Sequence, residues 1–497
     1  MCGGGRSLHN KQHFSNLIYE YFFLRIRFQY YECGDTLPSI DTLCDEFSVS
    51  SQTVKSALRR LRSEGYISMH NGRPTTVIFR QTGEDLSDFI TDYYSKRYKA
   101  FADLNETGLL IYIPLIMEGL CRMNDDEISG IFQLSEQPTT DNLLHFYCFV
   151  LQKLDNPLIM NLFWETAMFE GFLLAQKNAG ISLYSDQTIR DYLKAVAGYA
   201  AERNWTETYK VLFTFQKQTF EEVKRYVQKH ISPAPDSEQI PFKWRIYREH
   251  PQICYSLSVR LLHEMCMGEY SEAEYLPSYE KMSVKYNVSV STMRRTVYVL
   301  HHLGAVQPVN GKGTRICRIR EGDGMPDLSI APIRRNMAFF FQAFEIIMYS
   351  CEEALHITFS AISPEEKKQL KEQLRKYLAL GCCEISLWRL LLTVAVGSPL
   401  QGIREIYGNI YGLFLWGYSL KPSHETEPDN KRMYRMFTEE LIQALETDDI
   451  DQCAALIKQF VSKQFIFAEK YLIRHGFQQN ELRLSSSISF LLSANEG

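Results

Sequence analysis

The chain has 497 residues, a length that predicts several domains of roughly 100–200 residues each. It is 45% hydrophobic and 23% charged and has no apolar run near the roughly 20 residues of a membrane span, which indicates a soluble globular protein and no membrane partner. The formal net charge of −5 by itself argues against a nucleic-acid binder. The charge is unevenly distributed along the chain, however, because residues 1–80 carry +3 and residues 251–320 carry +4. Positive charge in these two segments favours phosphate binding there, with chance variation between domains as the alternative.

The cysteines and the start of the sequence bear on the compartment. Twelve cysteines occur without a CxxC pair, which disfavours a zinc framework and predicts reduced thiols. The first residues lack the apolar segment of a signal peptide. The sequence therefore predicts a cytoplasmic location and no cofactor.

Three short helices are predicted before residue 66. The first covers residues 17–27, where apolar side chains fall on one face. The second has apolar residues at Leu37, Leu43 and Phe47, and Val49-Ser50 forms the turn that follows. Ser50 is the expected N-cap of the third helix.

The third helix has one apolar face and one polar face. Its apolar residues recur at i, i+3, i+4 and i+7: Val54, Ala57, Leu58 and Leu61. The opposite face is polar and basic: Ser51, Gln52, Lys55, Arg59 and Arg62. A helix that lies in the DNA major groove needs this combination of a buried and a basic face.

A β-hairpin is predicted directly after the third helix. Gly65 ends the helix, and residues 66–69 and 75–79 are expected to pair around the turn at Asn71-Gly72. Three helices followed by such a hairpin form a winged helix-turn-helix.

The same segment occurs twice in the chain. Residues 37–77 (LPSIDTLCDEFSVSSQTVKSALRRLRSEGYISMHNGRPTTV) align without a gap with residues 276–316 (LPSYEKMSVKYNVSVSTMRRTVYVLHHLGAVQPVNGKGTRI), 239 positions later. Identical residues fall in the first helix, the turn and the hairpin, including Ser50 with Ser289 and Asn71-Gly72 with Asn310-Gly311. A period this long indicates a duplicated domain rather than a solenoid.

The rest of the chain is expected to be helical. Apolar residues recur at helical spacing between residues 83 and 230 and again from 334 to the end, and a Pro-rich stretch from 231 separates the halves. Asn156-Pro157-Leu158 and Ser398-Pro399-Leu400 match weakly at a shift of 242. The expected fold is mainly α, with a winged-helix domain at 1–82, a helical domain at 83–230, a linker at 231–250, a second winged-helix domain at 251–320 and a second helical domain at 321–497.

The sequence motifs LPSIDTL, VS, TVKSAL and NGRPT resemble the DNA-binding domain of the GntR family of bacterial transcription regulators. The resemblance covers about 65 residues in each copy. The all-helical partner regions are similar to the FadR-type branch, whose effector domain is a helical bundle. The resemblance implies DNA contacts from Ser39, Ser51, Gln52, Thr53, Lys55, Asn71, Gly72, Arg73 and Thr75 in the first copy. In the second copy it implies contacts from Ser278, Ser291, Thr292, Arg294, Arg295, Asn310, Gly311, Lys312 and Thr314.

Both copies depart from the family pattern. An arginine is usual two residues after the serine of LPS, where this chain has Asp41 and Glu280. A second usual arginine, just after the turn serine, is replaced by Ser51 and Val290. For each polar residue the alternative is a solvated helix face, and direct base readout is expected to be weaker than in the family.

One pair of residues has the spacing of metal ligands. Many FadR-type members bind a metal through an Asp-x3-His pair and further histidines, and Asp141 and His145 have that spacing. The later histidines are missing, because Thr438 and Phe460 stand where they would fall. A core-edge histidine is the favoured interpretation, and no metal site is predicted.

We therefore expect a transcription regulator with two DNA-reading heads in one chain. Its partners would be a double-stranded DNA operator and a small-molecule effector bound among aromatic residues of the helical domains, although core packing explains those aromatics equally well. The chain would act as an intrachain pseudo-dimer, and further homodimerisation stays open. The alternative is an interaction protein built on degenerate winged helices. An enzyme is disfavoured, since no GxSxG, Walker A or HExxH motif is present.

Overall fold

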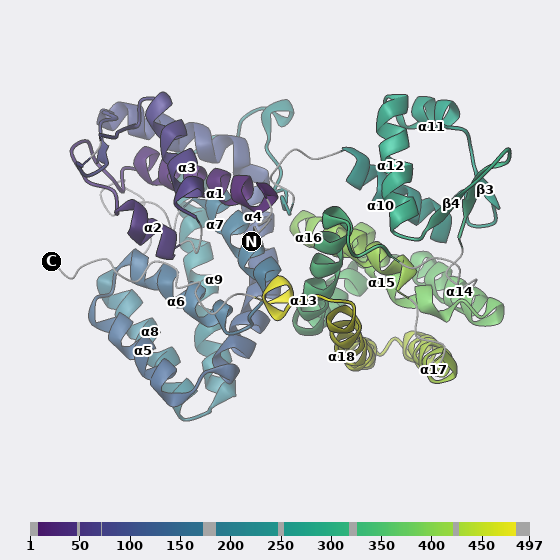
Figure 1. The fold of residues 1–497 in the computed structure, drawn as a ribbon. Coiled ribbons are helices and arrows are strands. Elements are labelled where there is room, and N and C mark those ends of the chain that lie inside the picture. Colours follow the sequence, from purple (N-terminus) through teal and green to yellow (C-terminus); the bar gives the residue numbers. More distant parts are fainter. Residues whose placement is uncertain are drawn as a thin grey trace. The chain divides into compact units, whose positions relative to one another are not determined.

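The computed structural model describes residues 8–46, 50–70, 72–171, 185–246, 253–317, 326–420 and 427–483. The described residues are mainly helical, as expected, and divide into two compact units (Figure 1). The first comprises Met1–Glu249, Leu400–Gly402 and Arg483–Gly497, and the second His250–Pro399 and Ile403–Leu482.

The first unit begins with three helices and a hairpin. They are α1 (Leu8–Arg27), α2 (Ile40–Glu46), α3 (Ser51–Ser63), β1 (Ile67–Ser68) and β2 (Thr76–Val77). The two strands pair antiparallel, with Ile67 opposite Val77, and form a shorter ribbon than predicted. Apolar side chains from all five elements form one core: Ile18, Phe22, Leu43, Val54, Leu58, Leu61, Ile67 and Val77. This is the predicted N-terminal winged helix-turn-helix.

A helical domain follows it in the first unit. Its helices are α4 (Gly83–Arg122), α5 (Asp125–Glu136), α6 (Thr140–Gln152), α7 (Pro157–Glu170), α8 (Asp186–Ala201) and α9 (Trp205–His230). Local sequence sets their ends: Thr82 forms a capping box with Asp85, and Gly171 ends α7 with φ +75°. At Gly119, α4 approaches α6 so closely that an added Cβ would lie 2.4 Å from the Val150 carbonyl oxygen.

Helix α4 is long and apolar enough to cross a membrane by composition alone. Its apolar side chains, however, are largely buried in the helical domain, among them Ile111, Leu115, Ile116 and Leu120. Burial inside the protein accounts for this apolar character.

The stretch predicted as a linker is packed against the first unit as far as it is described. After the short 3-10 turn Asp236–Glu238, the side chains of Phe242, Trp244 and Ile246 are all buried. The Trp244 indole donates to Asn161 Oδ1 of α7 at 2.8 Å. The Pro-rich composition predicted a linker, and in the structure these apolar side chains anchor the stretch to the first unit.

The second unit begins with three helices and a hairpin in the same order as the first, and it has one additional strand after its first helix. They are α10 (Ile253–Cys266), β3 (Tyr275–Leu276), α11 (Tyr279–Tyr286), α12 (Val290–His302), β4 (Val306–Val309) and β5 (Gly313–Ile316). The three strands form an antiparallel sheet in the order β3-β5-β4. Adding 239 to the residue numbers of α3 gives the bounds of α12. The same shift takes the isolated bridge between Thr36 and Thr76 to the pairing of Tyr275 with Arg315.

The remaining helices of the chain carry the second predicted helical region. They are α13 (Ala331–Ala361), α14 (Pro364–Leu380), α15 (Ser386–Gly397), α16 (Gln401–Leu415), α17 (Glu427–Glu446), α18 (Ile450–Arg474) and α19 (Gln479–Leu482). Helices α13 and α18 pack together, with the rings of Phe341 and Phe465 stacked 4.6 Å apart. Periodicity had predicted most of these helices.

Candidate nucleic-acid interface

Helix α3 is fixed in the first head by its cap and its apolar face. The Ser50 hydroxyl accepts from the Thr53 backbone N–H at 3.3 Å, which satisfies one donor of the first turn. Val54, Leu58 and Leu61 are fully buried beneath the helix. The opposite face is therefore held outward by both local and tertiary interactions.

The outward face of α3 carries the predicted polar residues. Ser51, Gln52, Arg59 and Arg62 are exposed, and Lys55 is half-buried. Among the described residues, no carboxylate lies within ion-pair distance of Lys55, Arg59 or Arg62. These cations are thus available for phosphate or base contacts.

Arg60 on the same helix is engaged within the protein. Its Nε donates to Glu64 at 3.1 Å, and its guanidinium lies 3.6 Å from the centroid of the Tyr19 ring. The Tyr19 hydroxyl in turn donates to Glu64 at 2.5 Å. Arg60 therefore joins α3 to α1.

The wing of the first head presents Gly72 and Arg73 to solvent. Gly72 adopts φ +71°, a left-handed conformation that favours glycine, and Arg73 is exposed. The Thr75 carbonyl accepts from the Leu37 N–H at 2.9 Å and so ties the hairpin to the start of the second helix. Asn71, the other predicted wing residue, lies outside the described residues.

Two other residues predicted to contact DNA stabilise helix starts. The Ser39 hydroxyl accepts from the Thr42 N–H at 3.0 Å and precedes α2. The Thr53 side chain is only 2% exposed, and its hydroxyl lies 3.0 Å from that of Ser50. Their positions favour capping roles, and burial removes the Thr53 hydroxyl from a phosphate.

In the second unit, α12 presents a comparable face. The Ser289 hydroxyl accepts from the Thr292 N–H at 3.1 Å, and it also lies 2.8 Å from the hydroxyls of Ser291 and Thr292. Arg294 and Arg295 are exposed, and among the described residues neither forms an ion pair. Tyr298, one turn beyond Arg294, is 55% exposed. The sequence prediction of DNA contacts did not include Tyr298, although its i+4 spacing from Arg294 places both residues on one face of the helix.

The second hairpin has a glycine and a basic residue at the positions equivalent to Gly72 and Arg73 of the first hairpin. Gly311 has φ +73°, and Asn310, Gly311 and Lys312 are all exposed. Thr314 is buried within β5, paired with Leu276 and Pro308, so its side chain belongs to the sheet. Ser278, like Ser39, is a helix N-cap and accepts from the Lys281 N–H at 3.4 Å.

The acidic departures lie at helix N-termini. Asp41 is in the first turn of α2 and Glu280 in the first turn of α11. A hydrogen bond from its own backbone N–H and one from Ser278 hold the pKa of Glu280 below its usual value. Carboxylates at this end stabilise a helix, but they repel phosphate.

Asp141 and His145, the pair with metal-ligand spacing, lie in different surroundings. Asp141 accepts hydrogen bonds from Arg25 and Tyr30, and His145 is buried, which lowers its pKa to about 4. Among the described residues, no group of three or more His, Cys, Asp or Glu side chains could hold a metal.

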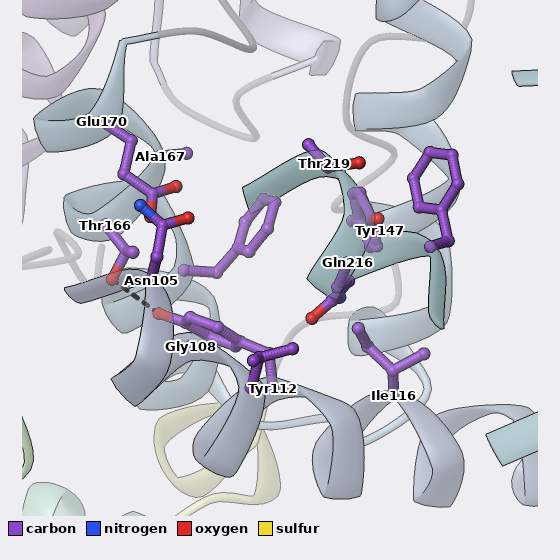
Figure 2. Close-up of a pocket in the computed structure, with 13 residues that line it drawn as sticks. Asn105, Gly108, Tyr112, Ile116, Tyr147, Thr166, Ala167, Glu170, Gln216 and Thr219 are labelled. Carbon is purple, nitrogen blue, oxygen red and sulfur yellow. Dashed lines mark hydrogen bonds between the residues drawn. The ribbon is translucent and has the colours of Figure 1, made fainter. Parts of the chain in front are cut away.

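A cavity of about 90 Å³ lies inside the first helical domain (Figure 2). Helices α4, α6, α7 and α9 line it with Asn105, Gly108, Leu109, Tyr112, Ile116, Tyr147, Phe163, Thr166, Ala167, Glu170, Phe215, Gln216 and Thr219. Phe215 belongs to the aromatic cluster that the sequence suggested as a pocket lining. The other lining residues come from helices too far apart in sequence to be grouped by pattern.

Comparison with known proteins finds a family match for the N-terminal winged helix-turn-helix. Residues 15–77 match the family model for bacterial regulatory proteins of the gntR family. A comparison with curated proteins finds no significant match.

Solved structures that resemble parts of the chain include three bacterial proteins. Listeria monocytogenes Lar, described as controlling expression of the agr system, is 14% identical over 45% of this chain and 98% of its own, with a TM-score of 0.22. E. coli McbR/YncC is 13% identical over 44% and 98%, with a TM-score of 0.23. Streptococcus agalactiae GntR is 16% identical over 42% and 99%, with a TM-score of 0.16.

Proposed function

We propose that this chain, whose residues 15–77 are a gntR-family DNA-binding domain, is a sequence-specific transcription regulator that binds DNA through two heads. The outward basic face of α3 carries this proposal, because Lys55, Arg59 and Arg62 stand there without carboxylate partners among the described residues. A wing with an exposed Arg73 beside it would add a backbone contact.

The second head is proposed because the two units contain helices and hairpins at equivalent sequence positions. Helices α3 and α12 have equivalent bounds and equivalent serine caps, and both hairpins turn through a left-handed glycine before an exposed cation. These features support a duplication of the winged helix-turn-helix. The weaker match at a shift of 242 supports a duplication of the helical region as well.

Two heads on one chain would form an intrachain pseudo-dimer in which each reads one half-site. The exposed faces of the two recognition helices differ: Gln52 and Lys55 stand in α3 where Ser291 and Arg294 stand in α12. We therefore propose an asymmetric operator. The proposal also includes a cytoplasmic location for the chain.

Effector control is the remaining part of the proposal. The cavity in the first helical domain is a concave, largely apolar space with a few polar groups, as small-molecule sites usually are. Arg25 and Asp141 connect this domain directly to the first head. A ligand in the cavity could thus alter DNA binding, and no catalytic role is proposed.

Duplex binding at several salt concentrations tests the proposal. The wild-type chain should lose affinity steeply as salt rises, with a slope of about −0.9 for each phosphate contacted. Replacing Lys55 and Arg294 together by Ala should reduce that slope by about two and weaken binding. Lys368→Ala, an exposed cation on α14, is the control and should change neither value.

The alternative function is an interaction protein whose heads no longer bind DNA. Asp41 and Glu280, both acidic at positions where the family usually has arginine, favour it. An absence of duplex binding at low salt, with a folded chain, would establish this alternative and overturn the proposed regulator.

A further inference from the structure

We infer that the cavity of the first helical domain binds a small organic ammonium ion, with the Glu170 carboxylate as its counter-ion. The inference rests on the effector control proposed above, and it supplies the chemical class of that effector. The residues that carry it are Glu170 and the aromatic rings around it.

Glu170 is a buried acid whose carboxyl group has no partner among the residues that the structure describes. Its residue is only 9% exposed, and it lines the cavity at the end of α7. Its backbone carbonyl accepts from the Tyr94 hydroxyl at 3.1 Å, but among the described residues its carboxylate has no hydrogen bond or ion pair. In Figure 2 this side chain extends toward Asn105 and Thr166, across the cavity from Gln216. Ionising a buried carboxyl group without a counter-ion is costly, and a cationic ligand in the cavity would supply that counter-ion.

The rest of the lining favours a cation over an anion. Among the described residues that line the cavity there is no Arg, Lys or His, so none of them offers a positive charge to an anionic ligand. Four aromatic residues line the space: Tyr112, Tyr147, Phe163 and Phe215. Aromatic rings attract ammonium groups through their π faces, most strongly in a site without water.

Some of the hydroxyl groups that line the cavity form hydrogen bonds within the protein. The Tyr112 hydroxyl lies 2.6 Å from that of Thr166 and also donates to the Leu162 carbonyl at 3.1 Å, as Figure 2 shows for the first contact. Gln216 and Thr219 of α9 face the cavity as uncharged polar groups. Among the described lining residues, Glu170 is therefore the one that can carry a negative charge near neutral pH.

Burial raises the pKa of Glu170 to about 8. The titratable groups near it are tyrosines of α4 and α6, namely Tyr93, Tyr94, Tyr112 and Tyr147, and burial raises the pKa of each so that all are neutral at pH 7. The free protein consequently holds Glu170 protonated at pH 7. An ammonium ligand selects the ionised form, so its binding releases about one proton to solvent at that pH.

Calorimetry on the full-length chain without DNA tests this inference. The probes are choline, tetramethylammonium and benzylammonium, and 3,3-dimethylbutan-1-ol serves as the uncharged isostere of choline. At pH 8 at least one ammonium probe should bind. If choline binds, its uncharged isostere should bind at least about tenfold more weakly. Because the charge of choline and tetramethylammonium does not titrate, their affinity should rise about tenfold from pH 6 to pH 7 and level off above pH 8.

Two variants assign the effect to Glu170. Glu170→Gln, which preserves shape, should weaken ammonium binding at least about tenfold and abolish the proton release, whereas Glu221→Gln on the exposed face of α9 should change neither. If no ammonium probe binds at millimolar concentration, or if Glu170→Gln binds it as well as the wild type, the inference is wrong. The wild-type pH series decides the matter even if Glu170→Gln fails to fold.

Measurements with DNA separate this inference from the proposed function. Ammonium binding by a chain that has no affinity for duplex would leave the cavity assignment standing and overturn the regulator. Salt-dependent duplex binding without any ammonium binding would overturn only the ligand class.

Discussion

Arg25 of α1 and Asp141 of α6 form an ion pair, with Arg25 Nη2 2.5 Å from Asp141 Oδ1, that joins the first head to the helical domain behind it. The Tyr30 hydroxyl donates to the other oxygen of the same carboxylate. The Arg25 guanidinium also lies over the rings of Tyr30 and Tyr21, 3.9 and 4.7 Å from their centroids. A residue that spacing suggested as a metal ligand is thus part of the interface between domains.

A second contact supports the same interface. Arg245, in the segment expected to be a linker, lies 3.0 Å from Glu20 of α1 and 3.0 Å from Glu165 of α7. The Glu165 side chain is almost fully buried, so Arg245 neutralises a charge that water cannot reach. The first head and first helical domain are therefore held together by two charged contacts.

Asp141→Asn should destabilise the first unit. The Arg25 side chain is only 4% exposed and would lose its counter-ion, at a cost of about 2–3 kcal/mol, below the 3–5 kcal/mol typical of fully buried pairs because Asp141 is partly exposed. Urea unfolding followed by CD measures this. Asp88→Asn, an exposed residue of α4, is the matched control, and equal stability of the two variants would contradict the role of the pair.

Ser50→Ala should loosen the start of α3 by about 1 kcal/mol, because the Thr53 N–H loses its acceptor. Hydrogen exchange of the first-turn amides should then be about fivefold faster. Ser56→Ala, within the exposed part of the same helix, should slow exchange slightly or leave it unchanged, since Ala is the better helix former. Faster exchange in both variants would point to a cause other than the cap.

Single substitutions of the two proposed heads should affect different halves of one operator. Lys55→Ala should weaken protection of one half-site in a footprint, and Arg294→Ala that of the other, because each residue lies on a separate recognition helix. Loss of the same half-site in both variants would argue against a pseudo-dimer. Lys368→Ala should leave the whole footprint intact.

Glu170 should make the first unit less stable as pH rises. Its pKa is about 8 in the folded chain against a usual 4.5. Between pH 4.5 and pH 8 the folded chain therefore keeps this proton, whereas the unfolded chain has lost it. Stability attributable to this group is therefore greatest below pH 4.5 and falls through this window up to pH 8. Glu170→Gln should be more stable than the wild type at pH 8, by up to a few kcal/mol, and nearly equal at pH 4.5. Thermal unfolding at the two pH values gives the comparison, and a constant difference would contradict the buried acid.

The local structure of the candidate interface could largely be predicted from neighbouring residues alone. The periodicity of Val54, Leu58 and Leu61 predicted which face of α3 is buried, and Ser50 is the helix cap expected of it. Thr53 shows the limit of that reasoning, because the family pattern suggested a DNA contact whereas packing buries its hydroxyl beneath the helix start. A motif gives a residue its position along the chain but not its exposure.

The sequence by itself determined the helices, their caps, the left-handed wing glycines and the 239-residue repeat, since these depend on residues within a few positions of one another or on direct identity. Only the tertiary structure decided that Asp141 pairs with Arg25, 116 residues away, and that the segment before α10 is anchored by Trp244. It also decided that Glu170 lines a cavity in which no described residue is its counter-ion. These features depend on which helices pack side by side. Local periodicity shows that a face is buried, and packing alone decides what it is buried against.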